Sequence, residues 1–341
     1  MKLARLVLLA ALAAPVLLAM PVLPSLAAPP PQEPVGIALE NWPYPYPVSY
    51  LELTVKGQPL RQAYMDVAPT GKPNGRTALL FHGRNFPASY WKDVIAGLAA
   101  DGYRVVATDQ IGFGKSSKPD LPANLDQFAR NNLALLDSLK LDKVDLVAHS
   151  MGGMVAVRFV RTYPERVRRL VLEAPIGLED YRFTVPPVTD KFLYDREVNQ
   201  TAEEYRKFLK VGYSLDLPDS AVDDFVSLQE RLKLSGEYPR WVTNFISSYQ
   251  MIHDQPVVHE YPLVATPTLF IMGVNDHNAP GRPYTTPELG KKMGFNADNA
   301  KAIAKTMTDA KVVAFEGVGH IPHMERPEPF LKEVTGFLDA K

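Results

Sequence analysis

Short apolar segments alternate along most of the chain with longer segments in which apolar residues recur at helical spacing. Eight short segments have the composition typical of β-strands: residues 50–55, 60–67, 77–81, 104–108, 143–148, 169–173, 268–272 and 311–315. Helical periodicity lies between or after them, in residues 88–100, 125–139, 151–163, 299–307 and 327–338. This alternation predicts an α/β fold with a mostly parallel, doubly wound, eight-stranded sheet that carries helices on both faces.

The strand pattern is interrupted once, in a block that contains only helical signals. Thr201 and Glu204 have the spacing of a capping box, which begins one helix, and helical periodicity continues over about 220–234 and 239–251. Aromatic residues are frequent throughout this block. We interpret residues 176–262 as a helical cap inserted into the sheet domain.

The first residues of the chain follow a different pattern. Lys2 and Arg5 precede an apolar run from Leu6 to Met20, and small residues alternate in Ser25-Leu26-Ala27. This pattern is typical of a Sec-type signal peptide. We therefore expect a periplasmic or secreted protein with no stable membrane anchor after cleavage, the alternative being an anchor that is not cleaved.

A proline-rich leader follows, in which neither a helix nor a central strand is favoured, and we expect it to be an extended arm. The predicted organisation is then a signal peptide (residues 1–27), the leader (28–49), an α/β core (50–175 and 263–341) and the cap (176–262).

Composition narrows the class of protein. Apolar residues make up 46% of the chain and the formal net charge is -1, which favours a folded domain and indicates no nucleic-acid partner. The chain contains no cysteine, so a thiol nucleophile and disulfides are excluded. No motif indicates a metal or a cofactor, and we expect a small-molecule substrate.

The segment Val147–Gly153 contains the most informative motif. It places Ser150 between a predicted strand and a predicted helix, where a sharp turn projects the serine hydroxyl above the sheet. Such a turn requires small residues two positions before and after the serine, and Ala148 and Gly152 occupy them, although glycine is usual at the first. We predict that Ser150 is a nucleophile; the alternative is a simple helix N-cap.

A nucleophilic serine requires a histidine base that a third group orients. Asp276 and His320 each follow a predicted strand, in the chain order serine, acid, histidine. We therefore predict Asp276 as the acid and His320 as the base. Glu173 is the alternative acid, and His323 and His277 are alternative bases.

The negative oxygen of a tetrahedral intermediate requires preorganised N–H donors. The backbone N–H of Met151, at the start of the predicted helix, is one expected donor. The second is the N–H of Arg84, in the turn after the strand 77–81, with Asn85 as the alternative.

We expect structural roles for three polar residues near these candidates. His82 and Gly83 precede Arg84, and we expect His82 to brace this loop through a side-chain hydrogen bond. Asp109 is expected to order the turn that follows it. His149 precedes the serine and is interpreted as a core residue.

Together these residues resemble the α/β-hydrolase superfamily over about residues 50 to 340. The resemblance rests on His82-Gly83, Asp109-x-x-Gly112-x-Gly114-x-Ser116, the Ser150 elbow, Gly273-x-x-Asp276 and Gly319-His320. It implies an α/β-hydrolase fold with a helical cap after the sixth strand. A serine nucleophile argues against the dehalogenases and epoxide hydrolases of that branch, which use aspartate.

The expected activity is hydrolysis of a carboxylic ester or lactone of a small, mainly apolar substrate through an acyl-enzyme. A carbon–carbon bond or amide hydrolase with the same triad is the first alternative. A binding protein that retains the fold without turnover is the second.

Overall fold

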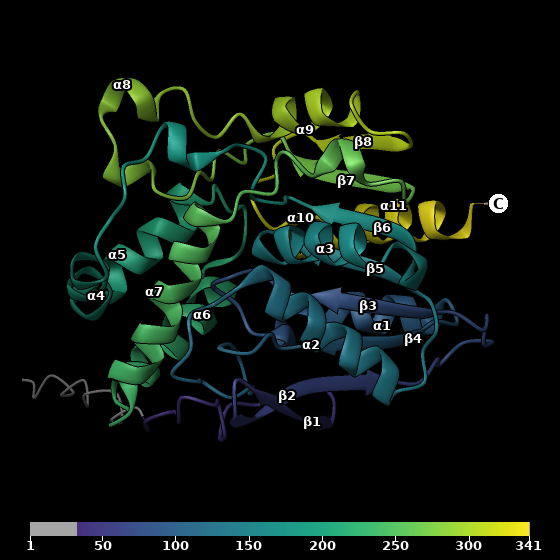
Figure 1. Cartoon of the computed structure of the whole chain (residues 1–341), viewed down its shortest axis with the longest axis horizontal. Coiled ribbons are helices and arrows are strands. Elements are labelled where there is room, and N and C mark those ends of the chain that lie inside the picture. The colour runs from purple at the N-terminus through teal and green to yellow at the C-terminus, as the bar shows by residue number, and fades with distance from the viewer. Residues whose placement is uncertain (1–32, 341) are drawn as a thin grey trace, which may run out of the picture. The chain divides into compact units, whose positions relative to one another are not determined.

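The computed structural model describes residues 33–340, which contain an eight-stranded sheet with helices on both faces (Figure 1). The predicted signal peptide lies outside the described residues. The strands are β1 (Val48–Val55), β2 (Gln58–Val67), β3 (Thr77–Phe81), β4 (Arg104–Thr108), β5 (Val144–His149), β6 (Val167–Glu173), β7 (Thr268–Gly273) and β8 (Ala310–Phe315). Their order in the sheet is β1-β2-β4-β3-β5-β6-β7-β8.

The direction of the strands brings several loops to one edge of the sheet. β1 pairs antiparallel with β2, and β2 pairs antiparallel with β4. All pairs from β4 to β8 are parallel. The loops that follow β3, β5, β6, β7 and β8 therefore begin at the same edge, and the predicted fold class is confirmed.

Helices cover the two faces of the sheet because successive strand residues point to opposite sides. Leu79 packs in one core and Leu80 in the other. Helices α1 (Lys92–Ala100) and α11 (Pro327–Asp339) cover one face, and α2 (Leu125–Ser138), α3 (Met151–Thr162) and α9 (Asn296–Ala304) cover the other (Figure 1). Two short helices, α8 (Pro287–Gly290) and α10 (Pro322–Glu325), lie in loops.

Four helices lie between β6 and β7 in the chain: α4 (Asp190–Asn199), α5 (Ala202–Lys207), α6 (Asp219–Lys233) and α7 (Tyr238–Asp254). Figure 1 shows them beside one end of the strands. The capping box of Thr201 and Glu204 is present. Helix α4 was not predicted, because Leu193 is its only buried residue and helical periodicity is absent.

The described part of the predicted leader is residues 33–49, of which 33–47 pack against α6 and α7 instead of forming a separate arm, and 48–49 begin β1. Val35 and Leu39 are buried in one cluster with Leu228 of α6 and Val242 of α7. The backbone N–H of Val35 also donates to the carbonyl oxygen of Arg231, at 3.1 Å. Trp42 and Tyr44 pack against the same cluster, so several apolar side chains hold this proline-rich segment in place.

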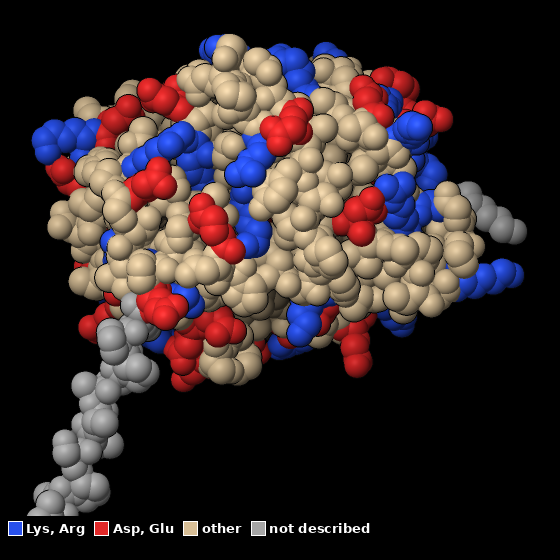
Figure 2. All heavy atoms as spheres, turned by 90° about the horizontal axis from the view of Figure 1, so that it is seen from below, with Lys and Arg blue, Asp and Glu red and all other residues tan. Residues whose placement is uncertain are grey.

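Charged residues of both signs are interspersed on the face shown in Figure 2, and no patch of one sign is visible there. Within residues 33–340, no helix is both long and apolar enough to cross a membrane. The same residues contain no group of three or more His, Asp or Glu side chains placed to hold a metal ion.

The start of α3 passes very close to the end of β3. A Cβ atom at Gly152 would lie 2.6 Å from the carbonyl oxygen of Phe81 and 2.7 Å from that of His82. Backbone atoms cannot yield as a flexible side chain can, so only glycine allows this approach. Gly152 thereby sets the distance between the helix and the central strand.

We predict that Gly152→Ala lowers the free energy of unfolding by about 1–3 kcal/mol, because its new methyl group overpacks the backbone. Gly336→Ala is a matched control, since Gly336 also lies in a helix and a Cβ there meets nothing within 4 Å. The control should gain up to about 1 kcal/mol from higher helix propensity. Urea unfolding measures both, and equal shifts would contradict the close approach.

Candidate active site

Ser150 occupies a strained turn between β5 and α3. Its backbone has φ 54° and ψ -119°, a combination that costs about 1–3 kcal/mol in a residue other than glycine. The turn is held by its surroundings: the N–H of Ser150 donates to the carbonyl oxygen of Glu173 at 3.0 Å, and its own carbonyl accepts from Gly153 at 2.9 Å. Ala148, at the position where glycine is usual, is fully buried in β5.

Two hydrogen bonds join the three residues that the motifs single out. His320 Nε2 lies 2.9 Å from Ser150 Oγ, and His320 Nδ1 lies 2.9 Å from Asp276 Oδ2. Because a carboxylate only accepts, Nδ1 carries the proton, and Nε2 is the acceptor that faces the Ser150 hydroxyl and, at 3.3 Å, the Asn278 amide. All three residues are buried. This arrangement can remove the proton from a serine hydroxyl.

The side chains of the alternative acid, Glu173, and the alternative bases, His323 and His277, form other hydrogen bonds. Glu173 is buried and pairs with His323: its carboxylate accepts from the backbone N–H at 2.7 Å and from Nδ1 at 2.9 Å. His277 Nδ1 instead donates to the carbonyl oxygen of Gly294, at 3.0 Å. Residues 33–340 therefore contain two imidazole–carboxylate pairs in which both side chains are buried, and of these only the pair of His320 and Asp276 contacts the Ser150 hydroxyl.

Two backbone N–H groups are available near the serine. Met151 is the first residue of α3, so its N–H has no acceptor within the helix. The N–H of Arg84 donates to no other residue in the described part of the chain, whereas that of Gly83 donates to the Tyr90 hydroxyl at 3.0 Å. The Asn85 side chain donates instead to the Tyr213 hydroxyl, in the segment between β6 and β7.

His82 braces the loop after β3 from inside the core. Its Nδ1–H donates to the carbonyl oxygen of Gly83 at 2.7 Å, and its Nε2 accepts from the N–H of Gln110 at 2.9 Å. Burial lowers the pKa of His82, which favours the neutral ring that these two bonds require. The imidazole thus joins the loop after β3 to the loop after β4.

Asp109 orders the loop after β4. One carboxylate oxygen accepts from the N–H of Ala88 at 2.7 Å, and the other accepts from the N–H of Lys115 at 2.8 Å and from the Tyr44 hydroxyl at 2.6 Å. The carboxylate therefore connects the loop after β4, the segment before α1 and the leader. It does not contact Ser150.

His149 and Tyr90 have a role that the sequence did not reveal. The Tyr90 hydroxyl accepts from the N–H of Gly83 and donates to His149 Nδ1 at 2.9 Å. His149 Nε2–H then donates to the carbonyl oxygen of His320 at 2.7 Å. Burial holds the pKa of His149 well below its usual range and raises that of Tyr90, so both stay neutral. They connect the loop after β3 to the loop that carries His320.

The segment between β6 and β7, which we predict to be a cap, contacts this site at two points. The backbone N–H of His320 donates to the carbonyl oxygen of Tyr213 at 2.9 Å. The ring centroids of the same two residues lie 4.4 Å apart. The Arg84 guanidinium donates from Nε to Ser248 Oγ and from Nη2 to the carbonyl oxygen of Phe245, both at 2.8 Å. These contacts enclose the serine, whose exposed fraction is 3%.

A buried serine, imidazole and carboxylate above a mostly parallel sheet define the class of α/β hydrolases. The family model of the alpha/beta hydrolase family matches residues 78–333. The chain therefore belongs to this family, and it is a hydrolase.

Several named proteins are similar over most of their length. The chain is 27% identical over 288 residues to the 2-hydroxy-6-oxo-2,4-heptadienoate hydrolase of Pseudomonas putida F1, covering 78% of this chain and 90% of that protein. It is 30% identical over 297 residues to the 2-hydroxy-6-oxononadienedioate/2-hydroxy-6-oxononatrienedioate hydrolase of Burkholderia vietnamiensis G4, covering 85% and 94%. Among solved structures, a "probable hydrolytic enzyme" from Pseudomonas aeruginosa PAO1 is 39% identical, with a TM-score of 0.87 and coverage of 91% and 99%.

We predict that Tyr90→Phe destabilises the fold by about 1–3 kcal/mol, because it leaves the Gly83 N–H and His149 Nδ1 without a buried partner. It should also lower kcat/KM for an activated ester, since His320 loses part of its support. Tyr103→Phe is the control, as the Tyr103 hydroxyl donates to Asp339 at 2.7 Å near the C-terminus. Thermal unfolding and steady-state kinetics test both variants, and unchanged kcat/KM in folded Tyr90→Phe would contradict the positioning role.

Proposed function

We propose that this protein is a serine hydrolase that cleaves a carboxylic ester or lactone through an acyl-enzyme. The observation that carries the proposal is the pair of 2.9 Å hydrogen bonds from Ser150 Oγ through His320 to Asp276. In the proposed mechanism, Ser150 Oγ attacks the carbonyl carbon while His320 Nε2 accepts its proton. Asp276 keeps the proton on Nδ1 and stabilises the imidazolium that forms.

The negative oxygen of the tetrahedral intermediate is proposed to accept from the N–H groups of Met151 and Arg84. These groups are fixed by α3 and by the braced loop after β3, so little reorganisation accompanies the reaction. His320 then gives its proton to the leaving oxygen, and water releases the acyl group by the same steps in reverse. No cofactor takes part in this sequence.

A second candidate is hydrolysis of a carbon–carbon bond beside a ketone, with Ser150 as the same nucleophile. The curated relatives are named as hydrolases of 2-hydroxy-6-oxo-dienoates, compounds that carry a carboxylate. Arg84 and Arg196 line a cavity of about 130 Å³ between the core and the cap. An arginine there can bind a substrate carboxylate through two parallel hydrogen bonds.

We further propose that the substrate is a small molecule encountered in the periplasm or outside the cell. This part of the proposal is supported by the pattern of the first 27 residues alone.

We predict that a fluorophosphonate labels Ser150, that Ser150→Ala lowers kcat by about 10⁶-fold and that Asp276→Asn lowers it by about 10⁴-fold. Glu173→Gln should change the unfolding temperature more than kcat, because Glu173 pairs with His323 and not with His320. Ser138→Ala, at the end of α2, is the control for the serine variant. A larger loss of kcat in Glu173→Gln than in Asp276→Asn would assign the acid differently.

The two candidate reactions are separated by a panel of p-nitrophenyl esters, simple lactones and a 2-hydroxy-6-oxo-dienoate. Arg84→Gln retains the backbone N–H and removes only the guanidinium. If the substrate carboxylate binds Arg84, the variant should raise KM for the dienoate by about tenfold or more, a larger change than in KM for the uncharged esters, whereas the lost bonds to α7 should affect kcat for both substrates alike. Turnover of esters alone supports the first candidate, and efficient turnover of the dienoate alone supports the second.

A further inference from the structure

An asparagine side chain lies beside the nitrogen of His320 that exchanges protons. Asn278 Nδ2 is 3.3 Å from His320 Nε2, and Ser150 Oγ is 2.9 Å from the same nitrogen. Among residues 33–340, these are the two side chains within hydrogen-bond distance of Nε2. The proposed mechanism uses Ser150 and gives Asn278 no role.

The backbone of Asn278 is held by the same carboxylate that holds the His320 ring. Its N–H donates to Asp276 Oδ1 at 2.9 Å, while Asp276 Oδ2 accepts from His320 Nδ1. Its carbonyl oxygen accepts at 2.9 Å from Nδ2 of Asn296, a buried residue at the start of α9. Asp276 therefore sets the position of Asn278 relative to the imidazole. A substitution that removes only the Asn278 side chain retains these bonds.

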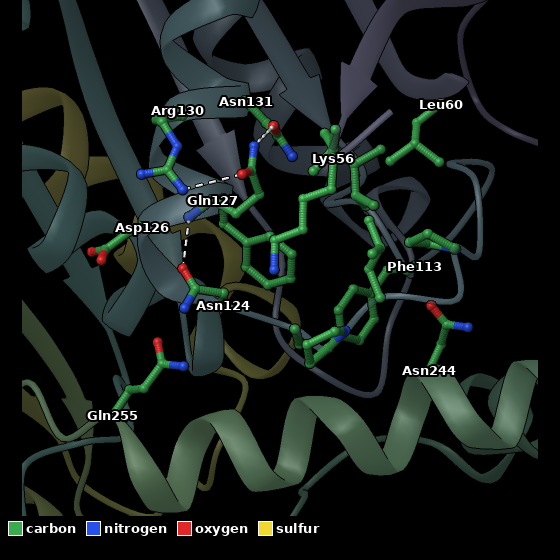
Figure 3. Close-up of a pocket in the computed structure, with 18 residues that line it drawn as sticks. Lys56, Leu60, Phe113, Asn124, Asp126, Gln127, Arg130, Asn131, Asn244 and Gln255 are labelled. Carbon is green, nitrogen blue, oxygen red and sulfur yellow. Dashed lines mark hydrogen bonds between the residues drawn. The ribbon is translucent and has the colours of Figure 1, made fainter. Parts of the chain in front are cut away.

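The side-chain oxygen of Asn278 is available to solvent. Asn278 is partly exposed, and its Oδ1 is not buried and forms no hydrogen bond within residues 33–340. Asn124 and Asn131, which line a cavity of about 350 Å³ beside α2, differ in this respect (Figure 3). Asn124 Oδ1 accepts from the N–H of Gln127 at 3.0 Å, and Asn131 Oδ1 accepts from Gln127 Nε2 at 2.7 Å. Their oxygens support the fold, whereas the oxygen of Asn278 can accept from water.

The second half of the proposed reaction needs a water beside His320 Nε2. In the acyl-enzyme, Ser150 Oγ is an ester oxygen without a proton, so Nε2 accepts its proton from water instead. Attack on the acyl carbon is fast only if this water is oriented. Nε2 orients one of its two hydrogens, and a second acceptor is required to orient the other.

The contact between Asn278 and His320 allows a water to enter. At 3.3 Å it is longer than most protein hydrogen bonds, so a water can replace Asn278 Nδ2 at Nε2. The last torsion of an asparagine side chain is broad, so the amide can then turn Oδ1 to the water. Asn278 is therefore able to supply the second acceptor.

We propose that Asn278 is a positioning residue for the water that releases the acyl group. The water donates one hydrogen to His320 Nε2 and the other to Asn278 Oδ1, which leaves a lone pair for the acyl carbon. Its oxygen forms a bond to that carbon, the bond from the carbon to Ser150 Oγ breaks, and the proton on Nε2 passes to Oγ. This inference rests on the proposed acyl-enzyme and adds a residue to its second step.

Asn278→Ala should affect the two steps differently. In the free enzyme, Asn278 Nδ2 competes with the Ser150 hydroxyl for one lone pair, so acylation should be unchanged or slightly faster. Deacylation should slow by about three- to tenfold, the usual effect of losing one hydrogen bond. Stopped-flow release of p-nitrophenol measures acylation, and mass spectrometry of quenched protein follows the loss of the acyl group. Asn275→Ala, an exposed asparagine in the same loop, is the control and should change neither step.

Methanol as a competing nucleophile separates positioning of water from a structural role. Methanol has one hydroxyl hydrogen, which His320 Nε2 accepts, so its attack depends less on Asn278 Oδ1. Asn278→Ala should therefore raise the ratio of methyl ester to free acid by about three- to tenfold. A merely structural role would lower both products alike. The ratio is set after the acyl-enzyme has formed, so it does not depend on which step limits kcat.

Asn278→Leu, which has nearly the shape of asparagine and no polar side-chain atom, should slow deacylation at least as much as Asn278→Ala. Circular dichroism and the unfolding temperature verify that both variants are folded. An unchanged product ratio in folded Asn278→Ala, or equal losses in acylation and deacylation, would overturn the inference and leave the acyl-enzyme in place. Absence of methyl ester and of an acyl group on Ser150 in the parent protein would overturn the proposed function, and the inference with it.

Discussion

The geometry of this hydrolase depends on one strained backbone position. The positive φ of Ser150 lifts its side chain away from the sheet. Hydrogen bonds of its backbone hold this conformation, and Gly152 lets α3 pass within contact of the carbonyl groups of Phe81 and His82. The same turn places Met151 at the first position of α3. A different conformation at Ser150 would therefore remove the hydroxyl from His320 and move the free N–H of Met151 as well.

Two imidazole–carboxylate pairs of similar chemistry lie at the same edge of the sheet. Asp276 with His320 and Glu173 with His323 are both buried and both have contacts of 2.9 Å. Chemistry alone does not distinguish them. The difference is that the second nitrogen of His320 faces Ser150, whereas His323 Nε2 is buried without a partner among the described residues. We interpret the pair of Glu173 and His323 as an anchor for the short helix α10, which directly follows His320.

Much of the sheet could be predicted because buried strands and amphipathic helices each have a characteristic period. The positions of Asp276 and His320 after successive strands also followed from the sequence, since parallel strands bring their loops to one edge. Helix α4 could not be predicted, because its stability comes from tertiary contacts and not from an apolar stripe. The bridge through Tyr90 and His149 joins residues 59 and 171 positions apart, and no local pattern encodes such a connection.

Arg84 connects two parts of the structure, the loop after β3 and helix α7. Its backbone lies in the loop after β3, where its N–H has no acceptor among residues 33–340, while its guanidinium donates to a backbone carbonyl and a hydroxyl of α7. If α7 moves away from the core, it must either break both of these bonds or pull the loop with it. In either case, the position of α7 is coupled through one side chain to the loop whose N–H we propose to hold the reacting oxygen.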